Sequence, residues 1–538
     1  MDFVLTLHSH LPYVLNHGTW PHGTDWLSEA AIDSYLPLLA HLLELETAAV
    51  PAPLTLCFTP VLANQLANPV FHRELDRYFE ARLASCEETA IALADVDGGA
   101  LSTVARFWAG RLGQLRTLFH AIGRDIPAAF RNLASRGRIE LAGGSATHGF
   151  LPLLGRDESI RLQLGLGRSE HRRIFGTAPE GCWVPECAYR PRGWWEPLPG
   201  APNPRVRAGT GEFVADAGFR WFFADAQMAR EDGETRTPYR AYDVVQAGGG
   251  QRAVSVLVRD PRSSAQVWSR HGGYPGDQWY LEFHKIHYPG GLKLWRVSAP
   301  GADLGQKQPY VAHNATGQVR EHARHYAEVL ANIAREQYPW GTNLIATPFD
   351  TELYGHWWFE GTQFIADLFR ALLHHDDVRP VTGSQHLAER PDRPGLHLAQ
   401  GSWGADGDFS MWLNPRTAWT WQRLWPLEDA FWNLAPRALA EPSAHVALAQ
   451  ATRELLLAQS SDWQFIISTG EATDYADHRF HSHTADLTRL LEALRDGLAS
   501  GGFDSATWIA AELRTRDDIF PDVLPSVATA LGLSAGLS

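Results

Sequence analysis

Seven short apolar runs, each followed by polar or glycine residues, constrain the fold of this chain more than any other feature. Long amphipathic stretches separate the runs, for example residues 28–46 and 321–336. This alternation is typical of repeated β-α units around a parallel sheet, so the sequence predicts an α/β protein. The seven predicted strands cover residues 3–7, 54–59, 139–142, 182–185, 221–224, 254–258 and 344–347.

The residues that follow these runs favour a barrel over an open sheet. In a parallel β/α barrel the carboxyl ends of all strands face one mouth, where the chemistry takes place. A doubly wound open sheet would instead gather such residues at a single switch point. Six of the seven runs end in a polar or ionisable group, and these groups are His8 and His10, Thr59, Glu186, Asp225, Arg259 and Asp350; the run 139–142 ends in Gly143-Gly144, which lead to His148.

Two interruptions and one change of pattern predict the domain organisation. Residues 191–250 are rich in Pro and Gly, and residues 268–295 are aromatic and glycine-rich, so we expect both segments to fold over the mouth. After about residue 394 the pattern is mainly helical. We therefore expect a barrel built from residues 1–190 and 251–393, an inserted small domain at 191–250, and a C-terminal α-helical domain at 394–538.

Composition excludes several classes of partner. The net charge of −14 comes from interspersed acids, which argues against binding to nucleic acid or to an anionic membrane surface. Four scattered cysteines do not make a disulfide framework, and the first residues lack the pattern of a signal peptide, so we expect a cytoplasmic protein. The expected partner is neutral or small, and the sequence does not distinguish a monomer from a homo-oligomer.

Aromatic residues in loops predict a binding surface. The chain has 21 Trp, and many of its aromatic residues lie in segments such as "GWWEPLPG" and "GSWGADGDFSMW", where no helical or strand period explains them. Flat amphipathic rings in loops suit ligand binding, although packing beneath long loops explains about half of such residues on general burial tendencies.

Glu186 and Asp350 form the predicted carboxylate pair. Each follows an apolar strand and has aromatic neighbours, in "WVPECAYRP" and "TPFDTELYGHWW". Two carboxyl groups facing each other across a mouth are what glycoside cleavage requires. A single acid at such a position is more simply explained by the partial positive charge of a helix N-terminus. Glu352 competes with Asp350 for the role of the acid.

Histidines at the strand ends permit two interpretations. Alternation along a strand predicts that the side chains of His8 and His10 point to opposite faces, with His10 toward the mouth. A zinc site made of the histidines with His148 and Asp225 is one alternative. With the carboxylate pair present, we favour His10, His148 and His356 as neutral hydrogen-bond partners, and no metal or other cofactor.

A second group of histidines lies in the predicted helical domain. His478, His481 and His483 share one amphipathic helix. We expect them to form a solvated helix face rather than a ligand set.

The motifs "HSHLPYV", "GGSATHGF", "WVPECAYRP", "TPFDTELYGHWWFEG" and "LLLAQSSDWQFIISTG" occur in this order over residues 8 to about 470. Together they resemble glycoside hydrolase family 57, and within that family the chain is most similar to the 1,4-α-glucan branching enzymes. The resemblance implies an incomplete (β/α)7 barrel with an inserted small domain, a C-terminal helical domain that closes the cleft, and a retaining mechanism.

The resemblance also implies roles for individual residues. It makes Glu186 the nucleophile and Asp350 the general acid/base. It further places Tyr239, in the segment "TRTPYRAYDV" before "AGGGQ", in a loop over the cleft. The residues that it implies to line the glucan subsites are His10, Trp268, Trp403, Trp412 and Asp462.

The predicted function is α-1,4-glucan branching, with transfer of a cleaved chain to a 6-hydroxyl and some hydrolysis. The nearest alternative is an α-amylase or 4-α-glucanotransferase on the same scaffold. A zinc-dependent mannosidase or deacetylase on a related barrel, and a glucan-binding protein without catalysis, are the remaining alternatives.

Overall fold

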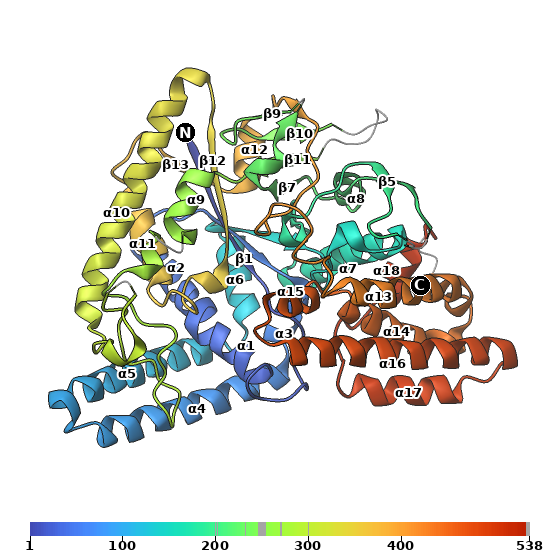
Figure 1. Ribbon diagram of the computed structural model, residues 1–538, viewed down its shortest axis with the longest axis horizontal. Helices are drawn as coiled ribbons and strands as arrows, with labels where there is room; N and C mark the ends of the chain where they lie inside the picture. Colours follow the sequence, from blue (N-terminus) through green and yellow to red (C-terminus); the bar gives the residue numbers. More distant parts are fainter. Residues whose placement is uncertain are drawn as a thin grey trace.

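A parallel sheet forms the centre of the protein (Figure 1), and seven strands pair in parallel within it. The computed structural model describes residues 1–199, 201, 203–231, 233–245, 254–269, 272–299 and 301–533. The strands follow the order β12-β1-β2-β3-β4-β7-β11, and every neighbouring pair is parallel. All seven predicted strands are confirmed as β1 (Asp2–Ser9), β2 (Leu54–Phe58), β3 (Ile139–Gly144), β4 (Gly181–Trp183), β7 (Trp221–Ala224), β11 (Ser255–Val258) and β12 (Leu344–Asp350).

The two outer strands, β11 and β12, meet at a single bridge among the described residues rather than along a ladder. Arg259 bridges Ala346 of β12, and the Asp260 N–H donates to the Ala346 carbonyl at 2.8 Å. The sheet is therefore an incompletely closed seven-stranded barrel. Three short strands extend it, namely β10 (Tyr242–Val244) beside β11, β14 (Gly395–Leu396) beside β10, and β13 (Arg379–Pro380) beside β1.

Burial explains why the strands read as continuous apolar runs. All eight residues of β1 and all five of β2 are buried, because helices cover the outer face of the parallel sheet. The helices in this part of the chain include α1 (Thr24–Ala30), the π-helical turn η1 (Ala31–Tyr35), α2 (Leu36–Thr47), α3 (Pro60–Leu66), α6 (Ile126–Ser135), α7 (Asp157–Phe175), α8 (Thr210–Asp216), α9 (Pro261–Trp268), α10 (Ala312–Gln337), α11 (Gly361–Leu372) and α12 (Gly383–Glu389).

A long helical hairpin extends from the barrel at the lower left of Figure 1. It consists of α4 (Pro69–Ala92) and α5 (Ala100–Ala121), which pack side by side. Arg82 of α4 donates to the carbonyls of Gly290 and Gly291 at 2.5 and 2.9 Å. The second predicted interruption of the sequence thus packs partly against this hairpin.

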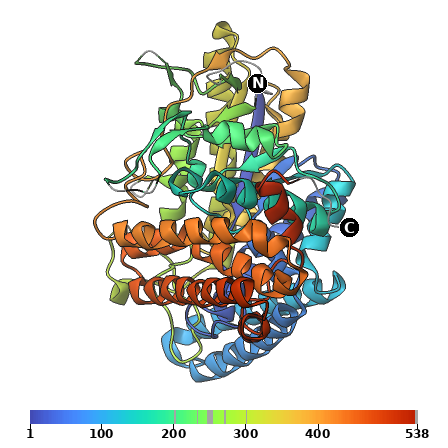
Figure 2. The ribbon, with the colours of Figure 1, turned by 90° about the vertical axis from the view of Figure 1, so that its right-hand side faces the viewer.

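The C-terminal part of the chain is helical, as predicted, and its helices stack on one side of the barrel (Figures 1 and 2). Within the described part of the chain, no helix is both long enough and apolar enough to cross a membrane. The C-terminal helices are α13 (Ala418–Leu439), α14 (His445–Ala458), α15 (Asp462–Thr469), α16 (Thr473–Ser500), α17 (Asp504–Arg514) and α18 (Leu524–Ala530).

The prediction of a separate inserted domain at 191–250 is wrong. Its range contains β7, which pairs with both β4 and β11 in the central sheet. The prediction failed because composition marked the flanking loops while the strand between them kept its apolar run. These loops form two hairpins, β5 (Gly193–Trp195) with β6 (Arg205–Arg207), and β8 (Arg230–Glu231) with β9 (Glu234–Thr235). The "AGGGQ" segment, residues 247–251, lies outside the described residues.

Candidate active site

The carboxyl ends of β1, β4 and β12 bring predicted residues to one mouth. His8 of β1 lies in register with Asp350 at the end of β12. Glu186 follows β4 in a 3-10 turn with φ +60°, and His148, beyond β3, has φ +58°. Left-handed conformations cost a residue with a side chain about 1–3 kcal/mol and concentrate at functional sites. The surrounding contacts must therefore hold both residues in place.

Both oxygens of the Glu186 carboxylate accept hydrogen bonds from the C-terminal part of the chain. Trp403 Nε1 donates to Oε2 at 2.8 Å, and Ser461 Oγ donates to Oε1 at 3.0 Å. The backbone N–H of Trp403 also donates to the Glu186 carbonyl at 3.0 Å. The His148 Nδ1 atom lies 3.6 Å from Oε1. Charge-assisted bonds of this kind stabilise the ionised carboxylate.

Asp350 lies in a different environment. No described residue donates a hydrogen bond to its carboxylate, and burial, followed by the charge of Glu352, raises its pKa to about 8 while Arg259 opposes the rise. Burial raises the pKa of Glu186 to about 7, and the charge of Asp350 adds to this rise against the bonds from Trp403 and Ser461.

The two carboxyl groups therefore differ in the way that acid and base chemistry requires. Glu186 ionises first because it has two hydrogen-bond donors, and Asp350 keeps its proton to higher pH because it has none. A pair of carboxyl groups whose environments separate their pKa values can supply one proton donor and one nucleophile or base.

The prediction that His8 and His10 face opposite ways is wrong. The His8 and His10 rings stack with a centroid separation of 6.0 Å, and both also stack on His148, at 4.9 and 4.0 Å. The physical reason is that β1 ends at Ser9. His10 has left the pleated strand, so the alternation of side chains no longer applies to it. Trp183 packs flat against His8 at 4.2 Å.

His10 connects the barrel to Asp462 of α15. Its Nε2 atom lies 2.9 Å from Asp462 Oδ2, and its Nδ1 atom lies 3.0 Å from Thr59 Oγ1. Burial would raise the pKa of Asp462, but His10, His148 and Ser460 outweigh it and lower the pKa to about 2. A carboxylate that is ionised at neutral pH thus lies beside the mouth, in the part of the chain where periodicity predicts only a helix.

Glu352 supports the site from below the mouth. Its Oε1 atom accepts the backbone N–H of His10 at 3.2 Å and a short hydrogen bond from Tyr35 of the π-helical turn η1. Only 7% of its surface is exposed. Glu352 is therefore occupied by other residues, and its effect on Asp350 is electrostatic.

The predicted aromatic residues divide into accessible and buried ones. Trp268 is 38% exposed and packs edge-on against Trp403, with ring centroids 6.2 Å apart. Trp403 borders the Glu186 carboxylate through its Nε1 hydrogen bond, and Trp268 packs on Trp403. Trp412 is 1% exposed and stacks on Phe150 at 4.6 Å, so in this structure it presents no face to a ligand.

Two other predicted residues make contacts outside the carboxylate pair. His356 Nδ1 lies 3.2 Å from Asp33 Oδ2. The Tyr239 carbonyl accepts the N–H groups of Asn343 and Leu344 at 3.0 and 3.1 Å. Leu344 begins β12, whereas Asp350 ends it, and at about 3.3 Å per residue the two ends are roughly 20 Å apart. The prediction that Tyr239 lies in a loop over the cleft is therefore wrong, because its backbone lies at the opposite end of β12 from Asp350.

Arg259 lies near Asp350. It forms a short ion pair with Asp225 and acts electrostatically on Asp350. Asp225 is thus occupied by a guanidinium rather than by the histidines, which argues against the alternative of a zinc site at the mouth.

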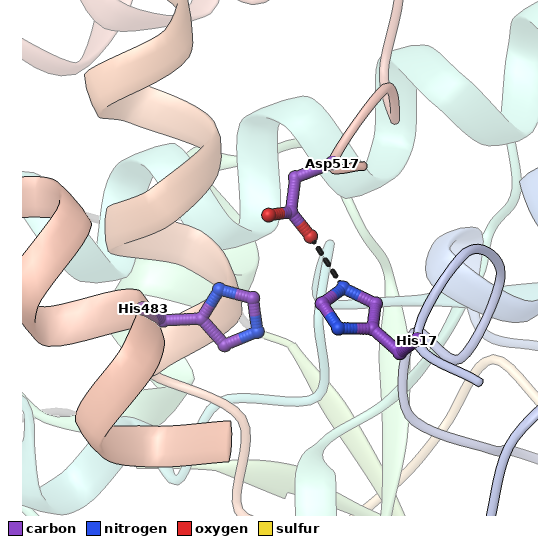
Figure 3. Close-up of side chains that lie close together, drawn as sticks. All are labelled: His17, His483 and Asp517. Carbon is purple, nitrogen blue, oxygen red and sulfur yellow. Dashed lines mark hydrogen bonds and ion pairs between the residues drawn. The ribbon is translucent and has the colours of Figure 1, made fainter. Parts of the chain in front are cut away.

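One group of three potential metal ligands lies close together in the described part of the chain, and it consists of His17, His483 and Asp517 (Figure 3). His17 Nε2 donates to Asp517 Oδ1 at 2.6 Å. His483 Nε2 accepts from Arg479 at 3.1 Å, and Arg516 donates to the other Asp517 oxygen at 2.8 Å. Two guanidinium groups already supply the positive charge there, so we assign this group to packing between the N-terminal loop and α16.

The prediction of a solvated histidine face is wrong for one of its members. His478 and His481 are exposed. His483 is fully buried, and its Nδ1 atom lies 2.9 Å from Glu454 Oε2. The helical period turns His483 away from the exposed side of α16 that holds His478 and His481, so that it packs against α14.

Sequence reasoning missed three residues of this site, Ser461, Tyr35 and Trp183. Ser461 lies within the motif "AQSSDWQF", next to Asp462, and that adjacency was the available signal. Tyr35 and Trp183 lie within apolar patterns and gave no separate signal.

Known proteins resemble this chain over most of its length. A model of glycosyl hydrolase family 57 matches residues 4–396, and a model of the C-terminal domain of 1,4-alpha-glucan branching enzymes matches residues 426–527. A 1,4-alpha-glucan branching enzyme of Thermococcus kodakarensis is 36% identical over 534 residues, which cover 96% of this chain and 77% of that protein.

Solved structures are similar over nearly the whole chain. The crystal structure of a branching enzyme of the same family type from Pyrococcus horikoshii has a TM-score of 0.91 and 37% identity, covering 98% of this chain and 96% of that one. An alpha-amylase from Thermotoga maritima has a TM-score of 0.83 and 27% identity, covering 98% and 99% respectively.

Proposed function

The chain belongs to glycosyl hydrolase family 57, among the 1,4-α-glucan branching enzymes, and from this premise we propose how its residues carry out the reaction. The enzyme cleaves an α-1,4-linked glucan and transfers the released chain to a 6-hydroxyl, which forms an α-1,6 branch. Glu186 is the nucleophile in this proposal, and Asp350 is the general acid and base.

In the first step the Glu186 carboxylate attacks C1 of a glucose unit. The C1–O bond breaks, and the proton of Asp350 passes to the departing glycosidic oxygen, so that a glycosyl ester on Glu186 and a shortened glucan result. In the second step ionised Asp350 takes the proton of an acceptor hydroxyl, whose oxygen attacks C1 and releases Glu186. Two inversions at C1 give net retention.

The observation that carries this proposal is the unequal treatment of the two carboxyl groups. Trp403 and Ser461 donate to Glu186, whereas no described residue donates to the half-buried Asp350 carboxylate. Near neutral pH this arrangement supports an ionised nucleophile opposite a protonated acid, which is the state that the first step requires.

The identity of the acceptor decides the product. Water as acceptor gives hydrolysis, a 4-hydroxyl gives chain transfer, and a 6-hydroxyl gives a branch. The rings of Trp268 and Trp403 offer apolar faces on which sugar rings can stack and displace water. Asp462 and His10, joined at 2.9 Å, are the polar groups placed to orient a sugar hydroxyl.

The similarity to the Thermotoga maritima alpha-amylase favours a second outcome on the same scaffold. We retain α-1,4 hydrolysis as the competing activity, because it uses the same glycosyl-enzyme and differs only in the acceptor. The proposal also includes a cytoplasmic location and a storage glucan such as glycogen as the physiological substrate.

Proton NMR of linear amylose incubated with the enzyme tests the function directly. New α-1,6 anomeric signals should outnumber new reducing ends, and both should vanish in Glu186→Gln, whose amide cannot attack C1. A product dominated by reducing ends, with few or no α-1,6 signals, would refute branching in favour of amylase activity.

A further inference from the structure

We propose that Ser461 is a positioning residue through which the C-terminal helical domain holds the Glu186 carboxylate ready for attack. This inference rests on the proposed role of Glu186. It holds equally for branching and for hydrolysis, because both reactions pass through the same glycosyl-enzyme.

Ser461 is fixed at its position by three contacts. Its side chain is fully buried. Its Oγ atom lies 3.0 Å from Glu186 Oε1 and 2.9 Å from His148 Nδ1, and its backbone N–H donates to the His148 carbonyl at 3.1 Å. Because Ser461 is fully buried behind Glu186, it acts on the reaction through Glu186 rather than by touching the glucan.

The direction of each hydrogen bond follows from the ionised state of Glu186. A carboxylate only accepts, so the Ser461 hydroxyl donates to it and its lone pair accepts from His148 Nδ1–H. The Nε2 atom of His148 is then the acceptor for His8, whose Nε2 lies 3.0 Å away. His8 Nε2 carries the proton, and His8 Nδ1 has no partner among the described residues.

Neutral histidines make this chain of hydrogen bonds consistent. Burial lowers the pKa of both His8 and His148 well below the ordinary value. The neighbouring His148 and His10 lower the pKa of His8 further, and His10 lowers the pKa of His148 further. A neutral imidazole donates with one nitrogen and accepts with the other, as the order His8, His148, Ser461, Glu186 requires. Each donor polarises the next, so the last hydrogen bond is strengthened toward Glu186.

His148 does not reach the nucleophile without Ser461. Its Nδ1 atom lies 3.6 Å from Glu186 Oε1, which exceeds a normal hydrogen-bond length. The serine bridges this gap. Residues 461 and 186 are 275 positions apart in the sequence, so the nucleophile reaches its working state only when the helical domain packs against the barrel.

The chemical role of Ser461 is electrostatic, and its proton stays in place. When Glu186 bonds to C1 it loses negative charge and the hydrogen bond weakens. When the ester breaks in the second step the carboxylate reforms and the bond strengthens again. The donor thus keeps Glu186 ionised before attack and stabilises it as the leaving group.

The test compares Ser461→Ala with Ser461→Thr, which keeps the hydroxyl, and with Ser102→Ala as a matched control. Ser102 is buried on α5 and makes one side-chain hydrogen bond, to the Ala90 carbonyl at 2.6 Å, far from the site in sequence. The measurements are the pH dependence of kcat/KM for amylose cleavage, KM, and the melting temperature.

Loss of a charge-assisted hydrogen bond should move the acid limb of the Ser461→Ala profile up by about one pH unit. Below that limb kcat/KM should fall about tenfold, with a much smaller change above it and an unchanged KM. Ser461→Thr should restore the limb, and Ser102→Ala should leave it in place.

An acid limb that stays at the wild-type pH in folded Ser461→Ala would overturn the positioning role, whether or not activity falls. Failure of the proposed function looks different, because the wild-type enzyme itself would then leave amylose unchanged. A wild-type amylase without branching would still permit the Ser461 test, scored on total cleavage.

Discussion

Replacing Trp403 by Phe removes one donor from the nucleophile while keeping an aromatic ring. In the wild-type enzyme the rate should rise as Glu186 ionises near pH 7 and fall as Asp350 loses its proton near pH 8. Trp403 Nε1 donates to Glu186 Oε2 at 2.8 Å. A hydrogen bond to an ionised group contributes about 1.5–3 kcal/mol. One pKa unit corresponds to about 1.36 kcal/mol, so the pKa of Glu186 should rise by about one to two units.

The assay is the pH profile of kcat/KM for amylose cleavage. The acid limb of Trp403→Phe should move up toward the alkaline limb near pH 8, and kcat/KM well below the limb should fall about 10- to 100-fold. Trp268→Phe is the matched control, because it removes a neighbouring indole that makes no bond to Glu186. Coincident acid limbs in Trp403→Phe and the wild type, in spite of lower activity, would refute this reasoning.

Three further predictions follow from the same contacts. Glu352→Gln should move the alkaline limb to lower pH, because the charge of Glu352 raises the pKa of Asp350; a shift to higher pH would contradict this. Asp350→Ala should lose amylose cleavage but keep much of its activity on an α-glucosyl fluoride, whose leaving group needs no proton, and equal loss on both would exclude the acid role. His483→Ala should lower the free energy of unfolding by about 1–3 kcal/mol in urea titrations, because buried Glu454 loses its partner. The exposed His481→Ala should change it by less than about 0.5 kcal/mol, and equal effects would show that burial is not the cause.

Local pattern was sufficient for the central sheet. A strand buried on both faces is mostly apolar, so β1, β2 and β12 can be predicted from their apolar runs. The same logic places Glu186 and Asp350, because a polar residue directly after a buried parallel strand lies at the mouth. Composition was a poorer guide, since the Pro- and Gly-rich flanks of β7 predicted a separate inserted domain at 191–250, although the strand itself was predicted and belongs to the sheet.

The sequence did not predict the direction of side chains beyond the end of a strand. The period of two holds only within the pleat, so it failed for His10, which follows the last residue of β1. The strand period also gave no position for Tyr239, whose carbonyl accepts hydrogen bonds at the start of β12. Such positions depend on contacts between segments that are far apart in the chain.

By itself the sequence determined the parallel strands, their order along the chain, the carboxylates that end two of them and the helical character of the C-terminal part. These features depend on neighbouring residues and on the period of one element. Only the tertiary structure decided which groups surround the carboxylates. Trp403 and Ser461 come from segments 217 and 275 positions beyond Glu186. A residue's ionisation depends on the donors, charges and burial around it in space, and no local pattern encodes those.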